Sequence, residues 1–114
     1  MNPAKMTKET AYKKVFSYIG LSAKGRNLVS GEFSTENAVK GQNAYLVIVA
    51  SDASDNTKKL FRNKTDFYGV PYREFSTKEE LGHILGKKIC ASMAFIDEGL
   101  AKAAVSCIDN YNNQ

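Results

Sequence analysis

The sequence predicts a single α/β domain, a three-layer α/β/α sandwich with a mixed sheet of about four strands. The chain has 114 residues, of which 43% are hydrophobic, enough for one core but too few for two. Residues 44–50 (AYLVIVA) form a continuous apolar run with β-branched side chains, which is typical of a strand buried on both faces. Strand and helix patterns alternate along the chain, and this alternation places helices on both faces of a sheet.

The first expected helix is amphipathic. Four of its residues recur with spacing i, i+3, i+4, i+7 and therefore share one apolar face: Tyr12, Val15, Phe16 and Ile19. We expect the helix to reach Lys24 and to end at Gly25, in a left-handed conformation. Gly20 in its interior costs about 1 kcal/mol relative to alanine. Close packing against another helix would explain that glycine.

A short strand and a second helix are expected next. The strand covers Leu28–Ser30 and is ended by Gly31. Ser34 or Thr35 is expected to cap a short helix that reaches about Lys40, after which a glycine ends it. The buried strand at 44–50 follows this helix.

Ser54 or Asp55 is expected to cap the third helix. Four residues are predicted to form its buried side: Leu60, Phe61, Phe67 and Tyr68. Gly69 and Pro71 together are a strong stop signal. A second long strand is expected at residues 72–75.

The last third of the chain is predicted to hold a helix, a strand and a helix. Ser76 and Glu79 have the spacing of a capping box, so a helix is expected to open there. Residues 91–96 form the last strand, and Asp97 caps the final helix. Its buried face is predicted from four residues: Ala101, Ala104, Val105 and Ile108. We expect the folded domain at 7–110, with loose tails at 1–6 and 111–114.

The segment EELGHILGKK, residues 79–88, combines two glycines with a lysine pair. It is not a phosphate-binding loop, because its glycines enclose three residues, Lys88 replaces the required hydroxyl residue, and it ends a helix. Gly86 is expected to close that helix. Gly82 lies in the helix interior, which indicates that something approaches its backbone closely. A neighbouring helix is the favoured candidate, and a nucleic-acid strand is the alternative.

No residue pattern predicts an enzyme, a metal or a cofactor. His83 is the single histidine, and the sequence spacing supplies neither a nucleophile nor an orienting carboxylate. Cys90 and Cys107 are too few to form a zinc site with it, and Cys90 fits a small buried apolar residue unless its thiol is exposed. Asp52 and Asp55 lack the spacing of a calcium loop and fit helix capping.

The net charge of +4 permits a polyanionic partner without requiring one. No apolar run approaches the ~20 residues of a membrane span, and the first residues lack the apolar core of a signal peptide. With two lone cysteines as well, we expect a cytoplasmic protein without a membrane partner, and a monomer. Five basic residues at element ends are expected to converge on one rim: Lys24, Arg26, Lys40, Lys87 and Lys88. Four others lie along the third helix and fit a solvated surface: Lys58, Lys59, Arg62 and Lys64.

Four blocks occur in a recognisable order and spacing. They are GLSAKGRNLVSGE (20–32), YLVIVASDASDNTKK (45–59), YGVPY (68–72) with KEELGHILGKK (78–88), and AFIDEGLA (94–101). Together they resemble the L7Ae family of ribosomal proteins, and most of all its short bacterial YlxQ-like branch. The resemblance covers about residues 15–108 and implies the same α/β/α sandwich. It also implies binding of kink-turn RNA, a sharply bent helix with tandem sheared G·A pairs, around the ribosome or its assembly.

The resemblance implies that two segments bind RNA: the start of the second helix and the loop before the last strand. In this chain they contribute Gly31, Glu32, Ser34, Thr35, Asn37, Lys40, Lys87, Lys88, Ile89, Cys90 and Ala91. A helix start suits this role because it offers free N–H groups to phosphates. The bent RNA is recognised largely by its shape.

Four positions depart from the family pattern. Asn37 stands where a lysine is usual, Phe33 and Ser34 replace an Asn–Glu pair of archaeal members, and Cys90 replaces an arginine of the bacterial loop. Asn37 can hydrogen-bond a base edge but cannot neutralise a phosphate, and each lost cation lowers the salt slope of binding by about one. The alternative is therefore a protein-interaction domain with weakened or lost RNA binding, in which Phe33 and Cys90 form part of an apolar patch.

Overall fold

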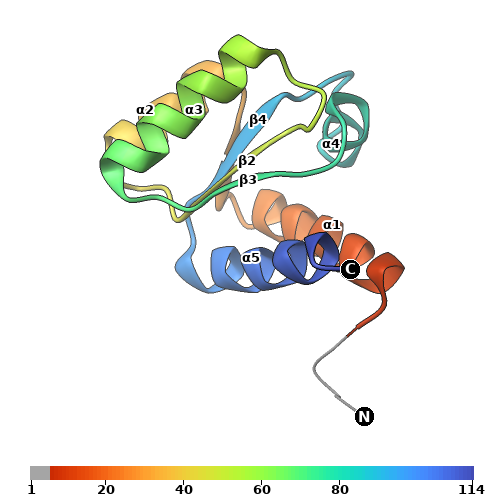
Figure 1. Ribbon diagram of the computed structural model, residues 1–114. Coiled ribbons are helices and arrows are strands. Elements are labelled where there is room, and N and C mark those ends of the chain that lie inside the picture. Colours follow the sequence, from red (N-terminus) through yellow and green to blue (C-terminus); the bar gives the residue numbers. More distant parts are fainter. Residues whose placement is uncertain (1–5) are drawn as a thin grey trace.

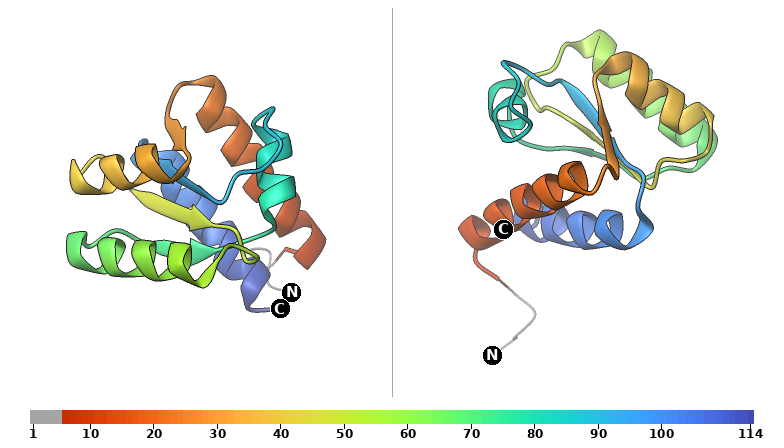
Figure 2. Two further views of the ribbon diagram at one scale, coloured as in Figure 1. Left: turned by 90° about the horizontal axis from the view of Figure 1, so that it is seen from above. Right: turned by 180° about the vertical axis from the view of Figure 1, so that it is seen from behind.

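The computed structural model describes residues 6–114, in which helices and strands alternate from end to end (Figure 1). The elements are α1 (Lys8–Lys24), β1 (Leu28–Ser30), α2 (Glu32–Lys40), β2 (Leu46–Val49), α3 (Asp55–Tyr68), β3 (Tyr72–Glu74), α4 (Lys78–Ile84), β4 (Ser92–Phe95) and α5 (Glu98–Asn112). One face of the sheet carries α1 and α5, and the other carries α2 and α3, which run side by side in the same direction (Figure 2). The predicted three-layer α/β/α sandwich is confirmed.

The sheet is mixed, as predicted, with strand order β1-β4-β2-β3. β2 and β3 are parallel, whereas β4 runs antiparallel to both of its neighbours. The register pairs Leu28 and Leu46 with Phe95 at one end of the sheet. At the other end, the start of β4 lies beside the ends of β1 and β2, and we call this the Gly31 end. Chain segments far apart in sequence meet there.

The core forms around β2 and β4, whose residues are all buried. The predicted central strand is therefore confirmed, although β2 covers only Leu46–Val49 of the run at 44–50 and Tyr45 is 44% exposed. On α3, Phe61 is fully buried, but Phe67 was wrongly assigned to the buried side and is 79% exposed. Phe67 follows Phe61 by six residues, or about 240° around a helix, so the two face in different directions. Thr65, one turn after Phe61, takes the buried place and satisfies its hydroxyl by donating to the Phe61 carbonyl at 2.6 Å.

Two predicted helix starts were wrong. α2 starts at Glu32 with Gly31 as its N-cap, so Ser34 and Thr35 lie inside the helix. α4 is capped by Thr77, whose hydroxyl accepts from the Glu80 N–H at 3.1 Å, one residue later than the expected capping box. The N-cap moves to Thr77 because Ser76 has φ +62, a left-handed conformation that does not lead into a helix. The predicted caps Ser54 and Asp97 are confirmed.

The end of α1 also differs in detail from the prediction. The helix does end at Lys24, but Gly25 has φ −83 and Arg26 takes the left-handed conformation, with φ +59. At the other end of the chain, α5 continues to Asn112, two residues past the expected domain boundary. Its Tyr111 packs edge-on against Phe75, which gives the extra turn a partner. Residues 1–5 of the expected tail lie outside the described residues.

None of the helices between residues 6 and 114 has the length and apolar character needed to cross a membrane.

Candidate nucleic-acid interface

The start of α2 follows β1 after one residue and lies beside the start of β4 at the Gly31 end of the sheet. The Gly31 N–H donates to the Ser92 carbonyl at 2.9 Å, which continues the pairing of β1 with β4 by one residue. Gly31 then turns the chain into the helix with φ +91. Because L side chains rarely adopt this conformation, the turn requires glycine here. Its Cβ would meet nothing, so the requirement is one of backbone conformation alone.

The first turn of α2 offers unpaired donors to a ligand. Its N-cap makes no side-chain hydrogen bond, and Glu32, Phe33 and Ser34 are all exposed. A helix start without a cap presents free N–H groups at the positive end of the helix dipole. Glu32 places a negative charge in the same turn, which reduces the attraction for phosphate. The turn is therefore better suited to hydrogen bonding with base edges, since a carboxylate accepts from amino groups.

The end of α4 is closed by a Schellman motif, as the prediction for Gly86 required. Gly86 has φ +70, and its N–H donates to the His83 carbonyl at 3.1 Å. The Lys87 N–H donates to the Gly82 carbonyl at 2.8 Å. These two bonds satisfy carbonyls that a helix end leaves free. They also direct residues 87–91 back towards the sheet.

Gly82 is needed because this returning loop crosses directly over it. A Cβ at Gly82 would lie 2.7 Å from the Cα of Ile89 and 2.8 Å from its backbone N and C. Both sequence-based candidates, a neighbouring helix and a nucleic-acid strand, were therefore wrong. The close approach comes from the chain's own loop, and it fixes where Ile89 sits.

One side-chain contact links the loop to the residue before Gly31, and a second lies within the segment that leads from the loop into β4. Lys87 Nζ donates to Ser30 Oγ at 2.6 Å, and the Cys90 thiol donates to the Ser92 carbonyl at 3.2 Å. Burial raises the pKa of the Cys90 thiol, so the reactive-thiol reading does not hold and the buried apolar role is confirmed. Ser30, which the sequence suggested only as the end of a strand, is thus a contact residue of the interface. The position of Ser30 next to Gly31 in the sequence could have indicated this role.

The predicted RNA-binding residues divide by exposure. The exposed ones are Glu32, Ser34, Asn37, Lys40, Lys87, Lys88 and Ile89. Gly31 and Ala91 are partly buried. Thr35 is fully buried and Cys90 is 4% exposed, so neither side chain is available to a ligand at the surface.

Lys40 does not join the other predicted residues. It lies in the last turn of α2, and nine residues make a helix roughly 13 Å long. Its Nζ is 3.8 Å from Glu36 Oε2. Arg26 comes just before the start of β1, at the opposite end of the sheet from Gly31, and Lys24 lines a cleft between α1 and α4 with Ile84 and Leu85. The expected convergence of five basic residues on one rim was wrong, and only Lys87 and Lys88 lie at the Gly31 end.

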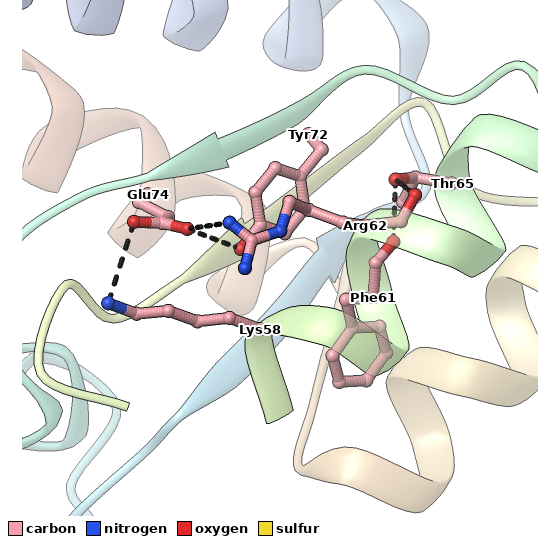
Figure 3. A network of polar contacts seen from close by, with 6 residues as sticks. All are labelled: Lys58, Phe61, Arg62, Thr65, Tyr72 and Glu74. Carbon is pink, nitrogen blue, oxygen red and sulfur yellow. Dashed lines mark hydrogen bonds and ion pairs between the residues drawn. The ribbon is translucent and has the colours of Figure 1, made fainter. Parts of the chain in front are cut away.

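Three of the basic residues of α3 are engaged by carboxylates. Lys58 and Arg62 lie 3.6 Å and 3.5 Å from the two oxygens of Glu74 on β3 (Figure 3). Tyr72 donates to the same carboxylate at 2.8 Å, and burial raises the pKa of this phenol. On the other side of the helix, Lys64 is 3.8 Å from Glu36. Much of this positive charge is neutralised locally, so α3 is a weaker candidate for RNA than the loop at 87–89.

The acidic segment SDASD serves as helix caps. Ser54 caps α3, and an Asp52 oxygen accepts the Lys78 N–H at the start of α4, at 2.8 Å. The capping role is therefore confirmed, although Asp55 itself is the first residue of α3. Across residues 6–114, no three His, Cys, Asp or Glu residues are grouped in a way that could hold a metal ion.

The buried hydroxyl of Thr35 yields a stability prediction. Its Oγ1 has no hydrogen-bond partner in the described part of the chain. A buried unsatisfied polar atom costs about 1–3 kcal/mol. Thr35→Val, which replaces the hydroxyl by a methyl group, is expected to raise the free energy of unfolding by about 1 kcal/mol without weakening any ligand contact. Urea denaturation measures the change, and a loss of stability would mean that the hydroxyl has a partner, such as a buried water.

Comparisons with known proteins agree on one family. The model of the family described as "Ribosomal protein L7Ae/L30e/S12e/Gadd45 family" matches residues 13–105. The "RNA-binding protein YlxQ" of Bacillus subtilis is 34% identical over 94 residues, covering 82% of this chain and 94% of that protein. The protein of the same name from Enterococcus faecium is 33% identical over 97 residues, covering 85% and 93%.

Two solved structures have the same fold. One, of a protein with unknown function from Bacillus halodurans C, has a TM-score of 0.81 at 32% identity and covers 84% of this chain and 97% of its own. The other, the "Giardia lamblia 15.5kD RNA binding protein", has a TM-score of 0.75 over 99% of this chain and 98% of its own. At 18% identity, this second likeness supports the fold alone.

Proposed function

This chain belongs to the ribosomal protein L7Ae/L30e/S12e/Gadd45 family, and from that premise we propose that it is an RNA-binding protein. Its target is a kink-turn or a similarly bent structured RNA, in association with the ribosome or translation. The names of the two YlxQ relatives support RNA binding. The resemblance of the interface segments supports the kink-turn.

One observation carries the proposal: two segments separated by more than 50 residues lie together at the Gly31 end of the sheet. The uncapped start of α2 supplies N–H donors, and the loop after Gly86 supplies two lysines. The Gly31 to Ser92 and Lys87 to Ser30 hydrogen bonds join the two segments. Backbone donors beside two exposed lysines suit a folded RNA, because fixed groups read its shape and cations neutralise its phosphates.

The alternative, a protein-interaction domain, retains one of its two supports. Phe33 is 79% exposed, but Cys90 is buried and does not extend an apolar patch around it. The exposed neighbours of Phe33 in sequence are a carboxylate and a hydroxyl. These two neighbours are more polar than the residues at the centre of a typical protein interface. Ile89, on the loop at the same end of the sheet, is an exposed apolar residue.

The test is a titration of the protein into a fluorescent kink-turn RNA. The control is the same RNA with Watson–Crick pairs in place of its G·A pairs, and both are measured at two salt concentrations. We expect the kink-turn to bind at least tenfold more tightly, with an affinity that falls as salt rises. Equal binding to both RNAs would refute kink-turn recognition, and a protein partner that survives RNase treatment would then favour the alternative.

A further inference from the structure

Phe33 is an aromatic side chain exposed to solvent in one of the two segments of the candidate interface. It lies in the first turn of α2, two residues after Gly31, and is 79% exposed. It makes no aromatic pair with any residue that the structure describes. No packing role inside the domain accounts for it.

The groups near Phe33 are of the kinds that bind the base and the phosphate of a nucleotide. Asn37 follows it by four residues, so the two side chains are neighbours on one exposed face of α2. The loop carrying Lys87 is held at this end of the helix by the hydrogen bond to Ser30. A flat apolar ring and an amide that both donates and accepts therefore share one face of α2, and a cation lies at the same end of the sheet.

We propose that Phe33 is a stacking platform for a single unpaired nucleobase of the bound RNA, with Asn37 reaching the edge of that base. The proposal rests on the proposed function and adds a contact that neither the family match nor the relatives' names assign. Unpaired bases can leave the helix and expose a face, and proteins commonly cover that face with an aromatic ring. Binding then buries a ring that the free protein leaves in water.

RNA is favoured over a protein partner by the charge of the surroundings. Within the described residues, neither Lys87 nor Lys88 has a carboxylate within ion-pair distance. An apolar protein surface docking on Phe33 would bring these lysines close to apolar groups, at a desolvation cost. A phosphate backbone would neutralise them instead.

The chain supplies a matched control for Phe33. Phe67 has the same exposed fraction, 79%, but lies in the last turn of α3, at the opposite end of the sheet. Phe33→Ala and Phe67→Ala remove the same atoms from equally exposed sites. Both variants are expected to fold, which thermal unfolding checks before any titration.

The experiment measures the affinity of four variants for the kink-turn RNA: Phe33→Ala, Phe67→Ala, Phe33→Leu and Phe33→Trp. The titrations are then repeated with RNAs in which each unpaired nucleotide is replaced in turn by an abasic one. We expect Phe33→Ala to weaken binding at least fivefold. Phe67→Ala should leave binding unchanged, Phe33→Leu should recover little and Phe33→Trp should restore it. With one particular abasic RNA, the effect of Phe33→Ala should disappear, since the base it stacks on is gone.

Any other result contradicts either the proposed function or the stacking role of Phe33. If the parent protein does not prefer the kink-turn, the proposed function fails and this inference with it. If the parent binds but Phe33→Ala behaves like Phe67→Ala, the function stands and the stacking role is overturned. Full recovery by Phe33→Leu, or an unchanged loss with every abasic RNA, would overturn it too, because the contact would then be apolar or to the backbone.

Discussion

Gly82→Ala is expected to lower the free energy of unfolding by roughly 1–3 kcal/mol, the usual cost of overpacking. The added methyl group would lie 2.7–2.8 Å from three backbone atoms of Ile89. Backbone cannot rotate away as a flexible side chain can, so either α4 or the loop at 87–91 has to move. The displaced loop carries Lys87, so the affinity for RNA should fall as well. Urea denaturation measures the first effect and the kink-turn titration the second.

Gly20→Ala is the matched control, because Gly20 is also an interior helix glycine. Its added Cβ would lie 4.0 Å from Ile84 Cδ1, an ordinary van der Waals contact. Here the better helix propensity of alanine should dominate and raise the free energy of unfolding by about 0.5–1 kcal/mol. Opposite signs at the two positions would confirm that crowding by Ile89 is the cause. Equal destabilisation would mean that both helices require glycine for another reason.

Much of the fold follows from patterns within single segments. The apolar run at 44–50 predicts the burial of β2, and Gly69 and Gly86 end their helices because left-handed backbone favours glycine. Two errors were local: Phe67 lies about 240° around α3 from Phe61, and Gly31 caps α2 before Ser34. Another arose where a distant residue decides. Helix α4 is capped by Thr77 instead of Ser76, because Ser76 adopts a left-handed conformation and its hydroxyl bonds to Tyr12 of α1. The sequence around Ser76 does not indicate a contact with Tyr12, which is 64 residues away.

The candidate site was harder to predict than the fold, because it depends on which ends of the elements meet. The sequence places lysines at the ends of elements, but it does not say at which end of the sheet each one lies. That is decided by the antiparallel direction of β4 relative to β1 and β2. This direction brings Ser92 and the loop before it to Gly31. Lys40 is the last residue of α2, which runs away from Gly31. The sequence likewise indicated that something approaches Gly82 closely, but it did not indicate that this is the loop at 87–91.

Lys87→Ala is expected to weaken kink-turn binding by roughly ten- to hundredfold, as the loss of one charge-assisted contact does. It should also reduce the slope of log affinity against log salt by about one, since one phosphate is no longer neutralised. In the free protein the Lys87 ammonium binds only the Ser30 hydroxyl among the described residues. Moving it to a phosphate therefore breaks no ion pair, so nearly all of its charge is available to RNA.

Lys40→Ala removes the same charge from the other end of α2 and is the control. Lys40 lies 3.8 Å from Glu36, and an exposed pair of this spacing contributes about 0.3–0.5 kcal/mol to stability. We expect it to leave both the affinity and the salt slope nearly unchanged. A titration of both variants at several salt concentrations separates two explanations. If the two variants lose equal affinity, the RNA senses only net charge. If only Lys87→Ala loses affinity, the RNA contacts the Gly31 end of the sheet. The loop that crosses Gly82 places Lys87 at that end.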